Sequence, residues 1–187
     1  MENDPGKIER NITISVATLA DVEGIQKVFY NTWLNTYPNI EAGVTVDDIK
    51  DRFKDRFTEE GLQEAKERIS KPPGGSTTFV AKEGNEIVGV CRILVLKKEN
   101  RIAAIYVLPE HQKKGIGKKF WEQAQKYFDP NKDTFVSVVD YNVNAISFYE
   151  SLGFEDTGKR WRDEKRRMKS GAIQTEAEMV IKAKNLR

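Results

Sequence analysis

The sequence predicts an α/β (α+β) fold in which helices flank a mixed, mostly antiparallel central sheet of about seven strands. Three β-prone segments, 77–81, 87–96 and 102–108, are joined only by short polar connections, which favours an antiparallel meander. An amphipathic helical segment then separates the last of them from a β-branched run at 134–139. This strand, helix, strand order favours a right-handed parallel crossover, so the sheet is expected to be mixed.

The N-terminal part is expected to form one strand and three helices. Apolar residues alternate from Ile12 to Val16, as in a half-buried strand, whereas residues 1–10 predict a flexible tail. Apolar residues at helical spacing follow in three segments. The first ends near Tyr37 and Pro38, the second follows Thr45 with Ile49, Phe53 and Phe57 on its apolar face, and the third follows Thr58 with Leu62, Ala65 and Ile69 on its buried face.

The C-terminal part adds two helices and the remaining strands. Residues 115–128 have helical periodicity and are stopped by Asp129 and Pro130. A short helix at 145–152 is expected to end at Gly153. Two strands, 157–161 and 173–181, complete the chain, and residues 1–187 are expected to form one domain.

Composition narrows the class of protein. Thirty-one basic and twenty-nine acidic side chains among 187 residues give a net charge of +2, so no nucleic-acid partner is expected from charge alone. No targeting segment or long apolar run occurs, and the lone Cys91 is compatible with a reducing interior, which together predict a cytoplasmic protein without a membrane partner. No metal site is expected, and the sequence leaves a homodimer open.

The most informative stretch is 105–118. A strand-like run stops at Pro109, a polar loop follows, and Gly115 and Gly117 open the next helix. Glycine lets the backbone approach a ligand, and a helix start presents unpaired amide hydrogens to an anion. Lys113, Lys114 and Lys118 add positive charge there. A diphosphate is the expected guest, although a simple turn into a helix explains the same residues.

Two ordered motifs carry a resemblance to a known family. The first runs from Val107 through Gln112 to Gly117, and the second is Asn-Val-Asn-Ala-Ile-Ser-Phe-Tyr at 142–149, continuing to Phe154. Together they resemble the GCN5-related N-acetyltransferase (GNAT) superfamily. The resemblance implies a splay between the fourth and fifth strands, acetyl-coenzyme A (acetyl-CoA) as donor and coenzyme A (CoA) as product. The segment with Trp33, Tyr37-Pro38 and Gly43 resembles bacterial and archaeal members, including polyamine N-acetyltransferases.

The resemblance also implies roles for individual residues. The strand edge at Ile105, Tyr106 and Val107 would pair with the pantetheine arm, and the Val107 amide would donate to the thioester oxygen. Tyr149 corresponds to a tyrosine near the thioester sulfur and is the expected catalytic residue, with an ordinary core aromatic as the alternative. The remaining cofactor-binding positions are expected to be Gln112, Lys113, Lys114, Gly115, Ile116, Gly117 and Lys118 in the loop, and Asn142, Asn144 and Ala145 opposite, together with Tyr149.

No general base is evident. Some family members place a carboxylate on the fourth strand where this chain has Ala103, so deprotonation through water is expected. His111, the single histidine, is expected to be a surface-loop residue. Cys91 lies in the middle of a strand with no histidine near it in sequence, which disfavours a covalent acetyl-enzyme.

The acceptor is the least defined feature. Trp33 and Tyr37 are the expected substrate-binding residues, and Glu41, Asp47 and Asp48 nearby favour a cationic amine such as spermidine or spermine. The alternatives are that Trp33 is a core residue and that the carboxylates are only a helix cap and a solvated face. A peptide or protein α-amine is the alternative acceptor. A non-catalytic acyl-CoA-binding regulator is the alternative class, and the basic connection 159–169 leaves polyanion binding open. Acyl-chain length and oligomeric state have no sequence signal.

Overall fold

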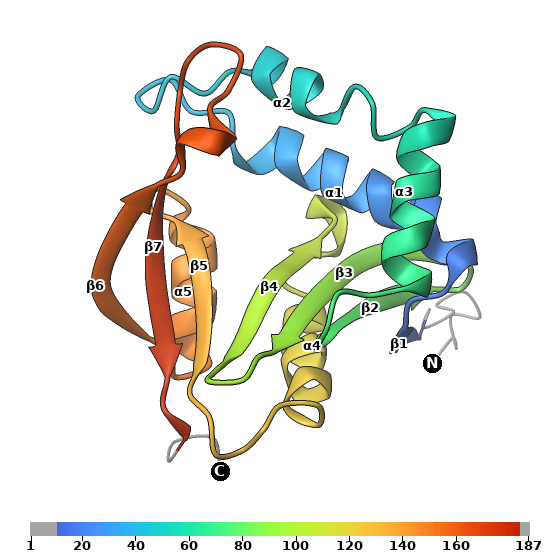
Figure 1. The fold of residues 1–187 in the computed structure, drawn as a ribbon, viewed down its shortest axis with the longest axis vertical. Helices are drawn as coiled ribbons and strands as arrows, with labels where there is room; N and C mark the ends of the chain where they lie inside the picture. Colours follow the sequence, from blue (N-terminus) through green and yellow to red (C-terminus); the bar gives the residue numbers. More distant parts are fainter. Residues whose placement is uncertain (1–10, 184–187) are drawn as a thin grey trace, which may run out of the picture.

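The computed structural model describes residues 11–183 and builds them around one sheet (Figure 1). Seven strands lie in the order β1-β2-β3-β4-β5-β7-β6. β4 and β5 pair in parallel, and every other neighbouring pair is antiparallel, which confirms the predicted mixed sheet. The predicted tail at 1–10 lies outside the described residues. The strands are β1 (Ile12–Val16), β2 (Ser76–Glu83), β3 (Glu86–Val95), β4 (Asn100–Val107), β5 (Thr134–Val139), β6 (Glu155–Arg162) and β7 (Thr175–Ile181).

Helices cover both faces of the sheet. Figure 1 shows α1, α2 and α3 on one side, with α4 and α5 behind the strands. None of the helices within residues 11–183 combines the length and apolarity needed to cross a bilayer. The helices are α1 (Val22–Thr36), α2 (Val46–Phe53), α3 (Glu59–Ser70), α4 (Ile116–Gln125) and α5 (Val143–Ser151), with short 3₁₀ turns η1 (Leu19–Asp21), η2 (Pro109–His111) and η3 (Glu164–Arg166).

Two details of the predicted helices are wrong. α2 ends at Phe53, so Phe57 lies beyond it, 41% exposed, with its ring 5.9 Å from that of Tyr30. The face of α3 that was expected to be buried is only half-buried, and no residue of this helix is buried. Ala65 and Ile69 on that face line a cavity, so only part of the face, at Ile69, packs against the hydrophobic core.

The parallel pair β4–β5 diverges after a short contact. Its register runs from Asn100↔Thr134 to Ile102↔Val136 and then stops. The register between β3 and β4 shifts at the same level, where Ala103 is the extra residue of a β-bulge. A bulge bends its strand, so β4 turns away from β5 (Figure 1). The predicted splay between the fourth and fifth strands is therefore confirmed.

Candidate active site

The splay leaves one edge of β4 without a strand partner. Leu108 N donates to the Val88 carbonyl at 2.9 Å, and Val107 is opposite Gly89 in the register. Because backbone groups in an antiparallel ladder alternate in direction, the amides and carbonyls of Ile105 and Val107 point away from β3, toward the splay. An extended ligand can therefore add to this edge as a strand would.

Tyr106, between these two residues, is oriented differently. Its backbone groups point toward β3 by the same alternation, and its side chain lines the cavity described below. Ile105 and Val107 thus form the open edge of the strand, whereas Tyr106 presents its side chain to the cavity.

The loop between β4 and α4 presents free amides. Lys119 N donates to the Gly115 carbonyl at 3.0 Å, so the amides just before Lys119 belong to the unpaired first turn of α4. Gly115 precedes the helix in the left-handed conformation (φ +79°), which a glycine adopts without strain. Gln112 is exposed, and its Nε2 donates to the Val107 carbonyl at 3.0 Å. The loop is therefore anchored to the open strand edge and fits a diphosphate group.

Gly117 sets the distance between α4 and α5. A Cβ atom at this position would lie 2.9 Å from two ring carbons of Phe148 on α5. That is shorter than a van der Waals contact, so a side chain at this position would force the Phe148 ring or one of the helices to shift.

α5 forms the wall opposite the loop. The Asn142 side chain accepts from Ala145 N at 3.1 Å and so caps the helix, while Asn144 is exposed. Tyr149 is 5% exposed, and its ring packs against those of Phe148 and Phe154 at 5.1 and 5.4 Å. Burial raises the pKa of the Tyr149 phenol, and the proximity of Cys91 and Tyr106 raises it further. The phenol therefore stays protonated and available as a donor.

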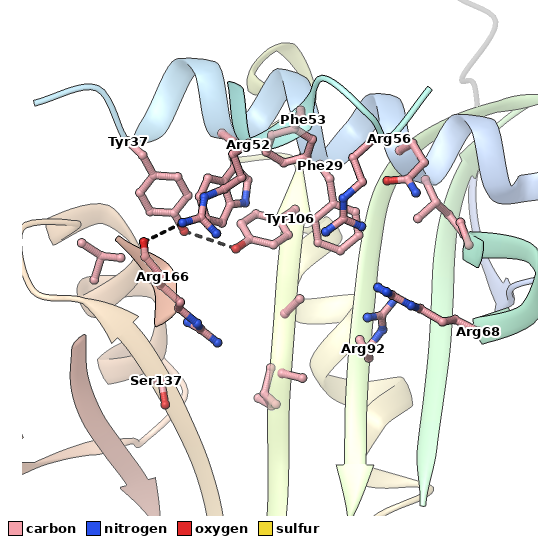
Figure 2. Close-up of a pocket in the computed structure, with 18 of the residues that line it drawn as sticks. Phe29, Tyr37, Arg52, Phe53, Arg56, Arg68, Arg92, Tyr106, Ser137 and Arg166 are labelled. Carbon is pink, nitrogen blue, oxygen red and sulfur yellow. Dashed lines mark hydrogen bonds between the residues drawn. The ribbon is translucent and has the colours of Figure 1, made fainter. Parts of the chain in front are cut away.

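A cavity of about 610 Å³ lies on the α1–α3 side of the splay. The bulge residue Ala103 lines it together with Trp33, Tyr37 and Tyr106. Figure 2 shows the two tyrosines facing each other. The Tyr37 and Tyr106 hydroxyls are 3.3 Å apart, and the Trp33 and Tyr37 rings are 4.5 Å apart. Burial raises the pKa of both tyrosines. Tyr106 stands between the edge residues Ile105 and Val107, and its side chain lines the cavity. The open edge of β4 and the cavity are therefore adjacent at this residue.

Comparison with known proteins decides the family. The model of the acetyltransferase (GNAT) domain matches residues 39–168, more than half of the chain. The chain belongs to the GNAT family. It is accordingly an acetyltransferase, and acetyl-CoA is the donor that the family uses.

Solved structures of low sequence identity share this GNAT fold. A PaiA N-acetyltransferase from Thermoplasma acidophilum in complex with coenzyme A has a TM-score of 0.66 at 19% identity, over 90% of this chain and 98% of that one. A ribosomal-protein alanine N-acetyltransferase from Escherichia coli has a TM-score of 0.58 at 18% identity, over 91% and 93%. A spermidine N-acetyltransferase SpeG chimera that includes Vibrio cholerae sequence has a TM-score of 0.57 at 17% identity, over 94% and 98%. These likenesses establish the fold.

The charges around this GNAT cavity are mostly positive. Six arginines and only two carboxylates line it, and both carboxylates bond to one of those arginines, Arg166. Apart from Arg166, which lies in the basic connection 159–169, sequence reasoning missed these arginines, because they come from separate elements and share no local pattern. The arginines are Arg52, Arg56, Arg68, Arg92, Arg101 and Arg166, and the carboxylates are Asp163 and Glu176.

The carboxylates that were expected near the acceptor lie elsewhere. Asp47 is exposed, 3.8 Å from Lys50, and Glu41 is exposed on a separate depression beside Tyr141. Asp48 is buried, but it accepts from the backbone amides of Thr45 and Ser170 at 2.8 and 2.7 Å. None of the three lines the cavity, so the predicted acidic wall for a polyamine is wrong.

Asp48 instead fastens α2 to the connection between β6 and β7. Burial alone would raise its pKa, but the hydrogen bonds from Thr45 and Ser170 outweigh burial and hold the pKa at about 2. A depressed carboxyl pKa stabilises the fold above the ordinary pKa of about 4, and that contribution is lost as the pH falls from about 4 to about 2.

We expect Asp48→Asn to lower the free energy of unfolding at pH 7 by about 1–3 kcal/mol, the worth of hydrogen bonds to a charged acceptor. The difference from wild type should shrink between pH 4 and pH 2. Urea denaturation at a series of pH values measures it, with the exposed Asp47→Asn as the matched control. A difference that does not change with pH would contradict the role of the charge.

Two further predictions concern nucleophiles and bases. Cys91 is completely buried and burial raises the pKa of its thiol, which agrees with the expectation that it is not a nucleophile. The prediction that His111 is a surface-loop residue is wrong. Its side chain is buried, with Nε2 3.4 Å from Glu83 on β2, because η2 turns it back under the loop.

Four of the seven basic side chains in the connection 159–169 pair with carboxylates. Lys159 lies 3.5 Å from Glu178, Arg160 pairs with Asp156 and Arg167 with Glu164, while Arg166 bonds Glu176. These partners reduce the positive charge that a polyanion would meet.

Proposed function

We propose that this protein transfers the acetyl group of acetyl-CoA directly to a primary amine held in the cavity beside Tyr106. The observation that carries the proposal is the meeting of the open β4 edge and the cavity at this residue. A ligand paired with Ile105 and Val107 places its end where an amine in the cavity can reach it. Direct transfer is favoured because the buried Cys91 thiol cannot act as an intermediate acceptor.

The chain's own groups supply what the reaction needs. Acetyl-CoA, when bound, brings an activated thioester. The Val107 amide points into the splay and would donate to the thioester oxygen as negative charge develops on it. The amides of 113–118 and the side chains of Lys113, Lys114 and Lys118 would hold the diphosphate. The Tyr149 hydroxyl would donate a hydrogen bond to the departing sulfur.

Two classes of acceptor and one non-catalytic alternative remain, and the charge of the cavity bears on the first. Spermidine and spermine were the first prediction, but their ammonium groups would meet the arginines of the cavity. A peptide α-amine is the second. A regulator that binds acyl-CoA without turnover is the alternative of another class.

The test is the release of CoA thiol from acetyl-CoA with a panel of polyamines, amino acids, aminoglycosides and peptides. Acetylated product should appear by mass spectrometry in equal amount to the thiol. We expect no acetylated protein when the acceptor is omitted. Tight CoA binding without turnover of any amine would favour the regulator, and an acetyl group found on Cys91 would overturn direct transfer.

A further inference from the structure

Three arginines form a positively charged group on one wall of the cavity, which we call the arginine cluster. Arg56 follows α2, Arg68 lies on α3 and Arg92 lies on β3. Figure 2 shows them together on one side of Tyr106, whereas Arg52, Arg166 and Tyr37 lie on the other side. All three line the cavity.

The carboxylates of the cavity do not neutralise this cluster. Within residues 11–183, its one ion pair joins Arg68 to Glu64 at 3.6 Å, between side chains 52% and 70% exposed, and such exposed pairs are weak. Arg92 donates to the neutral Thr78 hydroxyl at 3.3 Å, with its guanidinium carbon 6.0 Å from the Phe29 ring centre. By contrast, Arg101 in the same cavity lies 2.9 Å from Glu99 and 3.5 Å from Glu178.

The like charges of the cluster repel one another, most of all at Arg92, which is half-buried while Arg56 and Arg68 are exposed. Burial lowers the pKa of the Arg92 guanidinium, and the like charges of Arg68 and Arg56 lower it further. Burial and the charge of Arg68 also lower the pKa of Arg56, and the carboxylate of Glu64 only partly offsets them. A shared anion would remove the repulsion and gain charge-assisted hydrogen bonds.

We propose that the acceptor is a small primary amine that also carries a carboxylate or phosphate group, and that the arginine cluster binds this group while the amine reaches Tyr106. The inference rests on the proposed function and names its substrate class. Guanidinium groups suit both anions, since each presents oxygens that a planar fork of donors can bind.

The geometry also separates the two ends of the substrate. Arg92 is paired with Ala104, two residues along β4 from Tyr106, which is about 7 Å at the rise of an extended strand. The anionic group should therefore stand several bonds from the reacting amine. An α-amino acid without a second anionic group does not meet this requirement.

A matched set of acceptors tests the class. Pentylamine, 5-aminopentanoate and cadaverine share one chain length and differ at the far end, which is neutral, anionic or cationic, and an aminoalkyl phosphate of similar length adds the second anion. We expect kcat/KM for the anionic amines to exceed that for pentylamine by about tenfold or more, and cadaverine and spermidine to fall below pentylamine. Equal or higher values for the neutral and cationic amines would overturn the inference.

Variants then locate the effect. Arg92→Gln should reduce the preference for 5-aminopentanoate over pentylamine to less than about threefold, and Arg68→Gln should weaken it in the same direction. Lys66→Gln is the matched control, since Lys66 is an exposed cation on the same helix that does not line the cavity. The affinity for CoA should stay within about twofold in each variant. A tenfold loss of CoA affinity would assign the arginines to the donor and overturn the inference.

A binding measurement decides the inference even if no amine is turned over. Calorimetry of the CoA complex with the product analogues 5-acetamidopentanoate and N-pentylacetamide needs no catalysis. We expect the anionic compound to bind at least about tenfold more tightly in the wild type but not in Arg92→Gln. Turnover without an anionic preference would refute the inference alone, whereas anionic binding without turnover would refute the proposed function alone.

Discussion

Tyr149→Phe is expected to lower kcat by about tenfold or more, the loss typical of removing a general acid or a strong hydrogen bond to a developing charge. A hydrogen bond from the Tyr149 hydroxyl to the departing sulfur describes this role better than proton transfer. The reference pKa of a phenol, about 10, already exceeds that of a thiol, about 8.5, and burial raises the pKa of Tyr149 further. Full proton transfer to the sulfur is therefore uphill at equilibrium.

The melting temperature provides a second, independent measurement on Tyr149→Phe. Within the described residues its hydroxyl has no hydrogen-bond partner, although the side chain is 5% exposed. Since that oxygen is not among the buried atoms without a partner, and no hydrogen bond within the described residues is lost, its removal should leave the melting temperature nearly unchanged. A core role predicts no change in kcat, whereas our proposal predicts a large one at constant CoA affinity. Tyr127→Phe, at a position 43% exposed, is the control.

Gly117→Val is expected to raise the dissociation constant for CoA by about tenfold to hundredfold. Even the Cβ atom would lie 2.9 Å from the Phe148 ring, and the branched side chain adds two more carbons to this contact. Overpacking of this kind costs about 1–3 kcal/mol. Since α4 carries the amides of the loop and Phe148 lies on α5, either the ring turns aside or the helices move apart, and we expect either change to disturb the loop. Calorimetric titration with CoA measures the change.

A double variant separates this clash from general misfolding. Gly117→Ala should show a smaller loss, and combining it with Phe148→Leu should recover part of the affinity because the ring is gone. Gly74→Ala is the control, because a Cβ atom at that position meets nothing within 4 Å. Failure of the double variant to recover any affinity would show that Gly117 acts through something other than its contact with Phe148.

The acceptor side could not be predicted from sequence, and Asp48 shows why. In the sequence, Asp48 is a carboxylate close to two aromatic residues, as expected of a site for a cation. In the structure, its oxygens accept hydrogen bonds from the amides of Thr45 and Ser170. Ser170 is far away in the chain, so no local pattern reveals this bond. The arginine cluster escaped notice for the same reason, because each arginine reads alone as a solvated surface charge.

The donor side and the fold class were determined by the sequence itself. The strand, the glycine-flanked loop and the start of α4 are contiguous, and α5 follows as a second compact motif, so local backbone requirements are visible as residue types and spacing. Tertiary structure alone decided which side chains face the acceptor. The bulge at Ala103, the splay and the position of α3 beside the cavity bring Arg56, Arg68 and Arg92 together from separate elements. The electrostatic potential in a cavity depends on charged residues that are distant in sequence, and only the folded chain determines which of them line it.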